Sequence, residues 1–291
     1  MLSTYISTHK KPFDELMLNL IDKEEIPTEL KKSMLYSLSI GGKRLRPLLL
    51  FAVLEAFGHS AKKGYRVAAA LEMIHTYSLI HDDLPAMDDD SLRRGKPTNH
   101  IVFGEATAIL AGDSLLTHAF KIIAEDESLM PLQRVHLISE LSKAAGPMGM
   151  VAGQILDMEA EKHPISLSEL KEVHVHKTGR LIEFAIVSGA IISGANEELI
   201  QLLRQYASHI GLAFQIKDDI LDVEGNTVLI GKKVGSDEMN GKSTYVSLTS
   251  LEIAKRMLND EISAAMQLLD QLPGETNILR AITQYIQERQ A

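Results

Sequence analysis

The chain has 291 residues, of which 45% are hydrophobic, enough to bury a sizeable core in one large domain or two small ones. Its net charge of -9 argues against a general nucleic-acid-binding protein, because such proteins neutralise phosphates with a basic surface. The absence of cysteine excludes disulfide bonds and thiolate metal sites. We find no apolar run of signal-peptide or membrane-spanning length, and therefore expect a cytoplasmic protein without a membrane span.

Apolar residues return every three or four positions along almost the whole chain, which predicts an all-α protein. The predicted helices cover residues 4–22, 28–39, 44–57, 62–84, 104–124, 131–144, 147–161, 167–193, 196–222, 244–270 and 276–289. Capping signals support two starts, because Ser166 precedes Glu169 by three residues and Asn196 precedes two glutamates. Most of the nine prolines fall at helix starts or in loops. With no linker-like segment and no repeat, we expect one domain over residues 1–291, a large helical bundle.

Between Ser78 and Pro97 the sequence gathers five aspartates and two arginines: Asp82, Asp83, Asp88, Asp89, Asp90, Arg93 and Arg94. Carboxylates this close together require protonation, arginine partners or bound cations. Mg²⁺ shared with a phosphate is the commonest arrangement of this kind. Because Pro85 lies between Asp82 and Asp88, we expect the chain to leave helical geometry after Asp83 and to bring Asp88 back toward an ion. The spacing does not decide which of Asp88, Asp89 and Asp90 binds.

A second acidic cluster ends another predicted helix and contains Asp218, Asp219 and Asp222. Asp218 and Asp222 are four residues apart, so they share one helical face and can reach a common cation. Taken alone, such a cluster is more often a solvated helix end. Two clusters in one helical chain favour a shared cation site.

The junction before the third predicted helix carries two adjacent glycines followed by three cations: Gly41, Gly42, Lys43, Arg44 and Arg46. Free backbone N–H groups and the helix dipole also favour an anion at such a junction. A basic surface loop is an equally good interpretation of this segment alone.

The other basic residues are candidates for phosphate binding only because the same chain carries the aspartate clusters. Arg93 and Arg94 follow the first cluster, so one segment could hold cations and contact phosphate oxygens. Three more lysines are scattered along the chain as solvent-facing residues usually are: Lys177, Lys232 and Lys242. The last two belong to the glycine-bearing segment Gly225 to Ser243, which is either a lid or a disordered connector.

His75 precedes Asp82 by seven residues, two helical turns, so the two side chains could share a face. A buried core histidine is the commoner explanation for such a residue. The sequence contains no Ser/His/Asp arrangement or HExxH motif, which leaves hydrolase chemistry without support.

Several short motifs occur together over nearly the whole chain: Gly41-Gly42-Lys43-Arg44-Leu45-Arg46-Pro47, Asp82-Asp83-Leu84-Pro85-Ala86-Met87-Asp88, Arg93-Arg94-Gly95, Gly153-Gln154, Lys177-Thr178-Gly179, Gln215-Ile216-Lys217-Asp218-Asp219 and Gly241-Lys242-Ser243-Thr244. With this combination the chain resembles the trans-isoprenyl diphosphate synthase family, and within it the bacterial-type farnesyl diphosphate synthases. Each motif is weak alone and the set is highly specific. The resemblance implies a helical bundle around a central cavity, two aspartate motifs facing each other across it, and a homodimer.

The resemblance also implies a reaction and roles. Isopentenyl diphosphate would be condensed with dimethylallyl and then geranyl diphosphate by ionisation, condensation and elimination, with Mg²⁺, roughly three ions when substrate is bound. The implied metal ligands are Asp82, Asp83, Asp88, Asp218, Asp219 and Asp222. The implied contacts of the allylic diphosphate are Arg93, Lys177, Lys232 and Lys242. Those of the homoallylic diphosphate are Gly42, Lys43, Arg46, His75 and Arg94, with Thr178 and Gln215 near the developing cation. Catalysis would rest on Asp82, Asp83, Asp88, Arg93, Lys177 and Asp218.

Product length would depend on Tyr77 and its neighbour Ser78. Tyr77 lies five residues before Asp82, about 7.5 Å back along a helix. An aromatic ring there would form the floor of the cavity that receives the growing chain, as in the family's short-chain members, and would stop elongation at fifteen carbons. The alternative is that Tyr77 only packs in the core.

Three other functions stay open at this point. A geranylgeranyl diphosphate synthase would differ in cavity depth and would be recognised by its product length. A helical terpene cyclase also uses an aspartate-rich Mg²⁺ motif, but would not consume isopentenyl diphosphate. A non-catalytic helical subunit would release no diphosphate with both substrates and Mg²⁺.

Overall fold

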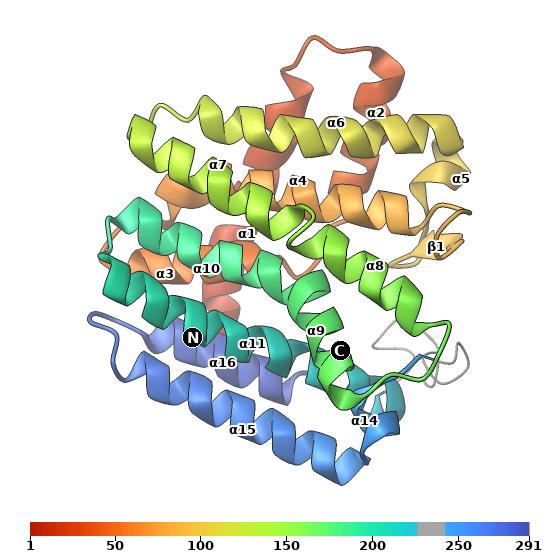
Figure 1. Ribbon diagram of the computed structural model, residues 1–291. Helices are drawn as coiled ribbons and strands as arrows, with labels where there is room; N and C mark the ends of the chain where they lie inside the picture. Colours follow the sequence, from red (N-terminus) through yellow and green to blue (C-terminus); the bar gives the residue numbers. More distant parts are fainter. Residues whose placement is uncertain (226–241, 291) are drawn as a thin grey trace.

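The computed structural model describes residues 1–225 and 242–290, and the all-α prediction is confirmed (Figure 1). The elements are α1 (Leu2–Asp22), α2 (Thr28–Ser39), α3 (Leu45–Ala56), η1 (Ala61–Gly64), α4 (Tyr65–Asp82), β1 (Leu92–Arg93), β2 (Lys96–Pro97), α5 (Asn99–Phe103), α6 (Glu105–Ala124), α7 (Pro131–Ala145), α8 (Met150–Ala160), α9 (Leu167–His174), η2 (Val175–Gly179), α10 (Arg180–Ser193), α11 (Glu197–Glu224), α14 (Tyr245–Leu248), α15 (Leu251–Leu269) and α16 (Asn277–Glu288). Most of the glycine-bearing segment, including Lys232, lies outside the described residues.

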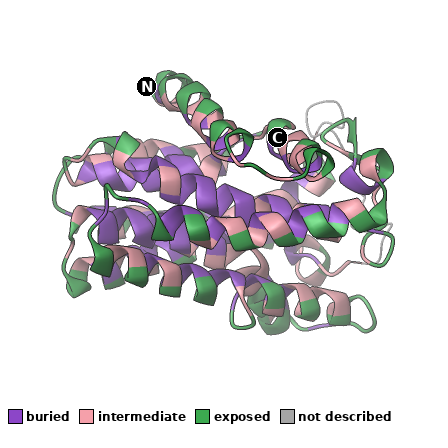
Figure 2. Cartoon of the chain, turned by 90° about the horizontal axis from the view of Figure 1, so that it is seen from above, coloured by how far each residue is buried: buried purple, intermediate pink, exposed green. Residues whose placement is uncertain are grey.

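The long helices stack side by side as a bundle in which α4 packs against α6 and α3, and α10 packs against α3, α7 and α11 (Figure 1). α4 is apolar around most of its circumference, as expected of a helix surrounded by others. The outer helix α15 is instead amphipathic, with Ala254, Leu258 and Ile262 turned inward. Buried residues accordingly concentrate in the middle of the bundle, and exposed ones lie on the outward sides of the helices (Figure 2).

α6 is long and apolar enough to cross a membrane by length and composition alone. In the bundle it packs along α4, with Ala111, Leu115 and Ala119 buried. We therefore interpret α6 as a helix of the bundle with one buried face.

The two predicted capping signals are present. Ser166 and Glu169 form a capping box at α9, and the Asn196 side chain accepts a hydrogen bond from the backbone N–H of Leu199 at 3.0 Å. These side chains satisfy N–H groups that the first helical turn leaves unpaired.

Three predicted helices are divided, and the local backbone gives the reasons. The predicted helix 62–84 begins with the short turn η1 and ends at Asp82. The helix 104–124 is instead confirmed as α6, which Gly104 at φ 81° separates from the short unpredicted helix α5. The helix 244–270 breaks before Ser250, whose side chain accepts the N–H of Ile253 and starts α15. The helix 167–193 contains the π-helical turn η2.

Pro12 lies inside α1, as the predicted helix 4–22 implied. One further detail differs from the prediction. A two-stranded hairpin follows the first aspartate motif, with Leu92 opposite Pro97. Its central residues Arg94 and Gly95 have φ of 52° and 74°, the positive values that a type I′ turn requires.

Candidate active site

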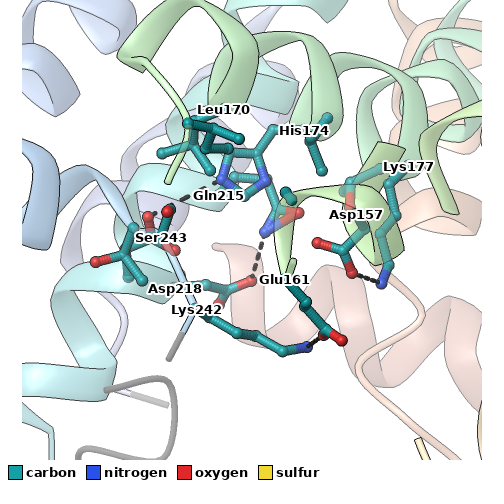
Figure 3. A pocket seen from close by; sticks show the side chains of 15 residues that line it. Asp157, Glu161, Leu170, His174, Lys177, Gln215, Asp218, Lys242 and Ser243 are labelled. Carbon is teal, nitrogen blue, oxygen red and sulfur yellow. Dashed lines mark hydrogen bonds and ion pairs between the residues drawn. The ribbon is translucent and has the colours of Figure 1, made fainter. Parts of the chain in front are cut away.

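An apolar cavity of about 450 Å³ lies between the second half of α4, α8 and η2. Its walls include Tyr77, Ser78, Met150, Val151, Ile155 and Met158, and polar groups from Arg46, His75, Asp82, Gln154, Lys177 and Thr178. Lys177 and Thr178 also line a second hollow of about 190 Å³, which reaches Asp218, Asp219 and Lys242 (Figure 3). The two aspartate motifs therefore border adjoining hollows.

The chain leaves α4 at Asp82 and folds back on itself, as expected from Pro85. The backbone N–H of Asp88 donates to the carbonyl of Asp82 at 2.9 Å, and that of Asp89 donates to the carbonyl of Leu84 at 3.2 Å. This turn brings Asp88 back to the end of the helix, while Asp89 adopts a left-handed φ of 51°. Burial, together with the neighbouring carboxylates of Asp88 and Asp83, raises the pKa of Asp82 to about 6.

Asp83 is turned toward Arg93 of the hairpin. Its Oδ1 accepts from Nε and Nη2 of Arg93 at 2.8 and 2.5 Å, and its Oδ2 accepts from Nε at 3.0 Å. Asp83 is buried, and Arg93 also lies 3.6 Å from Asp90. The arrangement places Asp83 as the residue that orients Arg93, and its expected role as a metal ligand stays a prediction.

The second aspartate motif is tied to the C-terminal part of the described chain. Oδ1 of Asp218 accepts from Nη2 of Arg289 at 2.6 Å, and Asp219 is buried with Oδ2 accepting from the backbone N–H of Tyr245 at 2.7 Å. Asp222 follows Asp218 by one turn of α11. Asp218 and Asp219 of this motif therefore line the hollow, and Asp219 also holds the start of α14.

Two lysines of the predicted set lie between the motifs. Nζ of Lys177 is 2.5 Å from Oδ2 of Asp157, and Nζ of Lys242 is 3.4 Å from Oε1 of Glu161 (Figure 3). Burial lowers the pKa of Lys242, but the charges of Asp157, Asp88 and Glu161 outweigh that effect and leave it raised. The charge of Asp88 in the first motif thus raises the pKa of Lys242, which lines the hollow beside the second motif.

The π-helical turn η2 exposes Lys177 and Thr178 to both hollows. A single π turn within α-helical structure often marks a functional site. Gly153 on α8 makes the close approach possible, because a Cβ atom there would lie 2.1 Å from the backbone nitrogen of Lys177. One turn further along α8, Asp157 reaches the lysine side chain.

Basic side chains gather on the other side of α4. Arg94 donates from Nη1 to the carbonyl of Gly41, and a Cβ atom at Gly42 would lie 2.7 Å from the same Nη1. His75 lines both this region and the apolar cavity, and burial together with Arg46 and Arg94 lowers its pKa well below 6.5. The Nε atom of Arg46 is buried without a hydrogen-bond partner among the described residues.

Arg44 corrects the expectation of three phosphate-binding cations at this junction. Its guanidinium is buried and donates to Oδ1 of Asp14 at 2.8 Å, to Oε2 of Glu72 at 2.6 Å and to the carbonyl of Leu38 at 2.9 Å. Arg44 therefore holds the loop against α1 and α4. Lys43 and Arg46 on either side of it remain the candidates for phosphate.

Sequence reasoning missed three charged residues of the site: Asp157, Glu161 and Arg289. Asp157 and Glu161 follow Gly153 at helical spacing, so the glycine of the Gly153-Gln154 motif could have indicated the face of α8 that approaches Lys177. Arg289 had no such signal, because nothing in the sequence says that α16 ends beside α11.

The carboxylates fit a Mg²⁺ ion that is shared with substrate. Within residues 1–225 and 242–290, no three histidine, aspartate or glutamate side chains are arranged to hold a metal by themselves. Mg²⁺ is commonly bound by one or two carboxylates with water and substrate phosphates. Asp82 with Asp88, and Asp218 with Asp222, provide donor pairs of that kind.

Comparison with known proteins agrees with this geometry. Residues 27–285 match the family model "Polyprenyl synthetase". The chain belongs to the polyprenyl synthetase family. The farnesyl diphosphate synthase of Bacillus subtilis is 52% identical over 99% of this chain and 98% of its own, and that of Geobacillus stearothermophilus is 54% identical over 91% and 90%. The crystal structure of geranylgeranyl pyrophosphate synthetase from Pyrococcus horikoshii superposes with a TM-score of 0.90 at 31% identity, covering 99% of this chain and 98% of that one.

Proposed function

We propose that this protein is a farnesyl diphosphate synthase that condenses isopentenyl diphosphate with dimethylallyl and then geranyl diphosphate. The observation that carries the proposal is the apolar cavity with Asp82 and Lys177 at one end and Tyr77 further back along α4. Identities of 52% and 54% to farnesyl diphosphate synthases support this product over the geranylgeranyl product of relatives that are 42% and 44% identical.

The charged rim would hold the allylic substrate by its diphosphate. When bound, Mg²⁺ supplies Lewis-acid stabilisation of the departing diphosphate, and Asp82, Asp88, Asp218 and Asp222 would hold it. Lys177, Lys242 and Arg93 would bind the same diphosphate oxygens. Asp157 and Glu161 would release Lys177 and Lys242 to the substrate, since each pairs with one of these lysines in the structure.

Isopentenyl diphosphate would bind beside Lys43, Arg46 and Arg94, with His75 between this pocket and the apolar cavity. His75 is neutral at neutral pH, because its pKa lies well below 6.5, and serves as a hydrogen-bonding group rather than a charge. Thr178 and Gln215 would face the allylic cation, and the apolar wall would exclude water that could capture it. Proton loss to the released diphosphate would complete the reaction, so no protein nucleophile is needed.

The floor of the cavity would set the product. Burial raises the pKa of Tyr77 to about 12, so its phenol is neutral, and the ring is only 7% exposed. A chain that grows along α4 from Asp82 meets this ring five residues back. The same geometry would stop elongation at fifteen carbons.

We also propose a homodimer. Large apolar side chains are exposed on α5 and α6, among them Ile101, Val102, Ile109 and Leu110. Such an apolar surface is typical of a protein interface. Light scattering of the purified protein would test the dimer, and a monomer would contradict it. A cytoplasmic location and the absence of nucleic-acid binding stay predictions of the sequence.

Incubation of purified protein with Mg²⁺, isopentenyl diphosphate and each allylic diphosphate tests the function. Farnesyl diphosphate from both dimethylallyl and geranyl diphosphate is expected. A product of twenty carbons would identify a geranylgeranyl diphosphate synthase instead. Release of diphosphate without consumption of isopentenyl diphosphate would indicate a cyclase, and no release would indicate a non-catalytic subunit.

A further inference from the structure

Gly112 occupies the buried interior of α6, a helix of 20 residues. Glycine weakens a helix interior relative to alanine, so a close contact is the usual reason for finding it there. A Cβ atom at Gly112 would lie 2.2 Å from Nε2 and 2.6 Å from Cδ2 of His81. The missing side chain is therefore the space into which the His81 ring fits.

His81 is the residue before Asp82 and lies between α6 and the cavity. Its Nε2 is 3.1 Å from the carbonyl oxygen of Ile109, three residues before Gly112, so the ring donates to α6 from the notch that the glycine leaves. On its other side the ring packs edge-on against Tyr77, with 5.7 Å between ring centroids and 77° between planes. His81 and Tyr77 both line the apolar cavity.

We propose that Gly112 and His81 determine product length together with Tyr77. Gly112 lets the His81 ring withdraw from the cavity onto the backbone of α6. The withdrawn ring then supports Tyr77 from behind and fixes the position of the floor. This inference rests on the proposed prenyltransferase function.

Opposite changes in product length follow for the two residues. In Gly112→Ala the new Cβ displaces the His81 ring from α6 toward Tyr77 and the cavity, which leaves less room for a long acceptor. The displaced atoms belong to the end of a flexible side chain and alanine favours the helix, so this variant should fold. In His81→Ala the support behind Tyr77 is lost, so the floor can recede and admit a longer chain.

The experiment measures product lengths, and kcat/KM for dimethylallyl and geranyl diphosphate, in the full-length protein. Gly112→Ala should accumulate the ten-carbon product and lower the geranyl-to-dimethylallyl ratio of kcat/KM by about tenfold, the lower range for one methyl group in an apolar pocket. His81→Ala should add a twenty-carbon product. In the double variant the Gly112→Ala effect should disappear, because no ring remains to be displaced. Thr117→Ala, exposed on the same helix, is the control for increased helix propensity and should match the wild type.

Thermal unfolding and light scattering verify that each variant folds and keeps the wild-type oligomeric state. A folded Gly112→Ala variant with the wild-type product and kcat/KM ratio would overturn the inference, as would a full Gly112→Ala effect in the His81→Ala background. A His81→Ala variant that still makes only farnesyl diphosphate would overturn the supporting role of the ring. If the wild type makes no prenyl product, the proposed function itself fails. If it makes farnesyl diphosphate and the variants do not differ, only the present inference fails.

Discussion

Arg289 on the C-terminal side of α16 is joined to Asp218 of the second aspartate motif by a hydrogen bond of 2.6 Å. Its guanidinium also lies 4.2 Å above the ring of Phe214, and the side chain is only 4% exposed. The pKa of Lys43 is lowered by burial and then by the charge of Arg289. Arg289 therefore belongs both to the surroundings of the aspartates and to the basic pocket around Lys43.

Replacement of Arg289 by methionine should weaken binding of isopentenyl diphosphate. The loss of one hydrogen-bonded charge is worth about 1.5–3 kcal/mol, so KM should rise about 10–100-fold, with a smaller change in kcat. Steady-state kinetics with isopentenyl diphosphate as the varied substrate measures this. Arg280→Met on the same helix, where Arg280 pairs with the exposed Asp270, is the matched control. Equal effects of the two substitutions would mean that only packing of α16 matters.

The adjacent carboxylates Asp82 and Asp83 should respond differently to amide substitution. Asp82→Asn should raise the Mg²⁺ concentration for half-maximal activity by at least about tenfold, because its carboxylate faces the hollow. Asp83→Asn should lower kcat while leaving the Mg²⁺ dependence near that of the wild type, because its oxygens hold Arg93. Mg²⁺ titrations of activity test the pair, with the exposed Asp260→Asn as control. A shift in Asp83→Asn as large as in Asp82→Asn would show that Asp83 also binds the ion.

The sequence predicted the helices well because burial and periodicity are encoded locally. It also predicted that Asp88 returns toward Asp82, since Pro85 forbids a continuous helix. The breaks inside the predicted helices were missed for a different reason. The π turn at Lys177 lies against α8 at Gly153, a tertiary contact that no window of sequence contains.

In the candidate site, too, tertiary contacts could not be predicted from local sequence. Charge alone made Arg44 equivalent to Lys43 and Arg46. Only its own burial and its hydrogen bonds to Asp14 and Glu72 distinguish Arg44 as a structural cation. Contacts between residues far apart in the sequence cannot be predicted from the spacing of motifs.

The buried ion pair of Arg44 and Glu72 should be essential for stability. Their side chains are 5% and 4% exposed. Arg44 has a left-handed φ of 53° at the end of the loop that contains Gly41 and Gly42. Removing one partner leaves the other charge buried and unpaired, so Arg44→Leu should lower the free energy of unfolding by about 3–5 kcal/mol. Urea denaturation measures the change.

The partly exposed ion pair of Lys121 and Glu24 is the control for the loss of unfolding free energy in Arg44→Leu. Lys121→Ala, which removes the pair with Glu24, should cost only about 0.2–1 kcal/mol. If Arg44→Leu costs no more than Lys121→Ala, the network does not hold the loop.

Tyr77→Ala should lengthen the product. Removing the ring opens the floor of the cavity along α4, so chains of twenty carbons or more are expected in place of farnesyl diphosphate. Chromatography of the dephosphorylated products measures their lengths. Tyr36→Ala is a control for loss of an aromatic ring, since Tyr36 packs against Phe103 and does not line the cavity. An unchanged product distribution in Tyr77→Ala would place the floor elsewhere.

His75 should make the protein less stable in acid. Its folded-state pKa is lowered first by burial and then by Arg46 and Arg94, while in the unfolded chain it is near 6.5. The stability that His75 contributes as a neutral group is therefore complete above about pH 6.5. It is lost as the pH falls, by up to about 1.4 kcal/mol per unit, because only the unfolded chain takes up the proton.

His75→Gln removes this titration while keeping a neutral hydrogen-bonding side chain. The free energy of unfolding should then fall less between about pH 7.5 and 5.5 in the variant than in the wild type. Histidines elsewhere, including His9 and His118, whose pKa values burial also lowers, act equally in both proteins and cancel in the difference. Urea denaturation of both proteins at each pH gives the comparison. Parallel pH profiles would mean that His75 takes up a proton in the folded protein, where it would add a charge to the basic pocket.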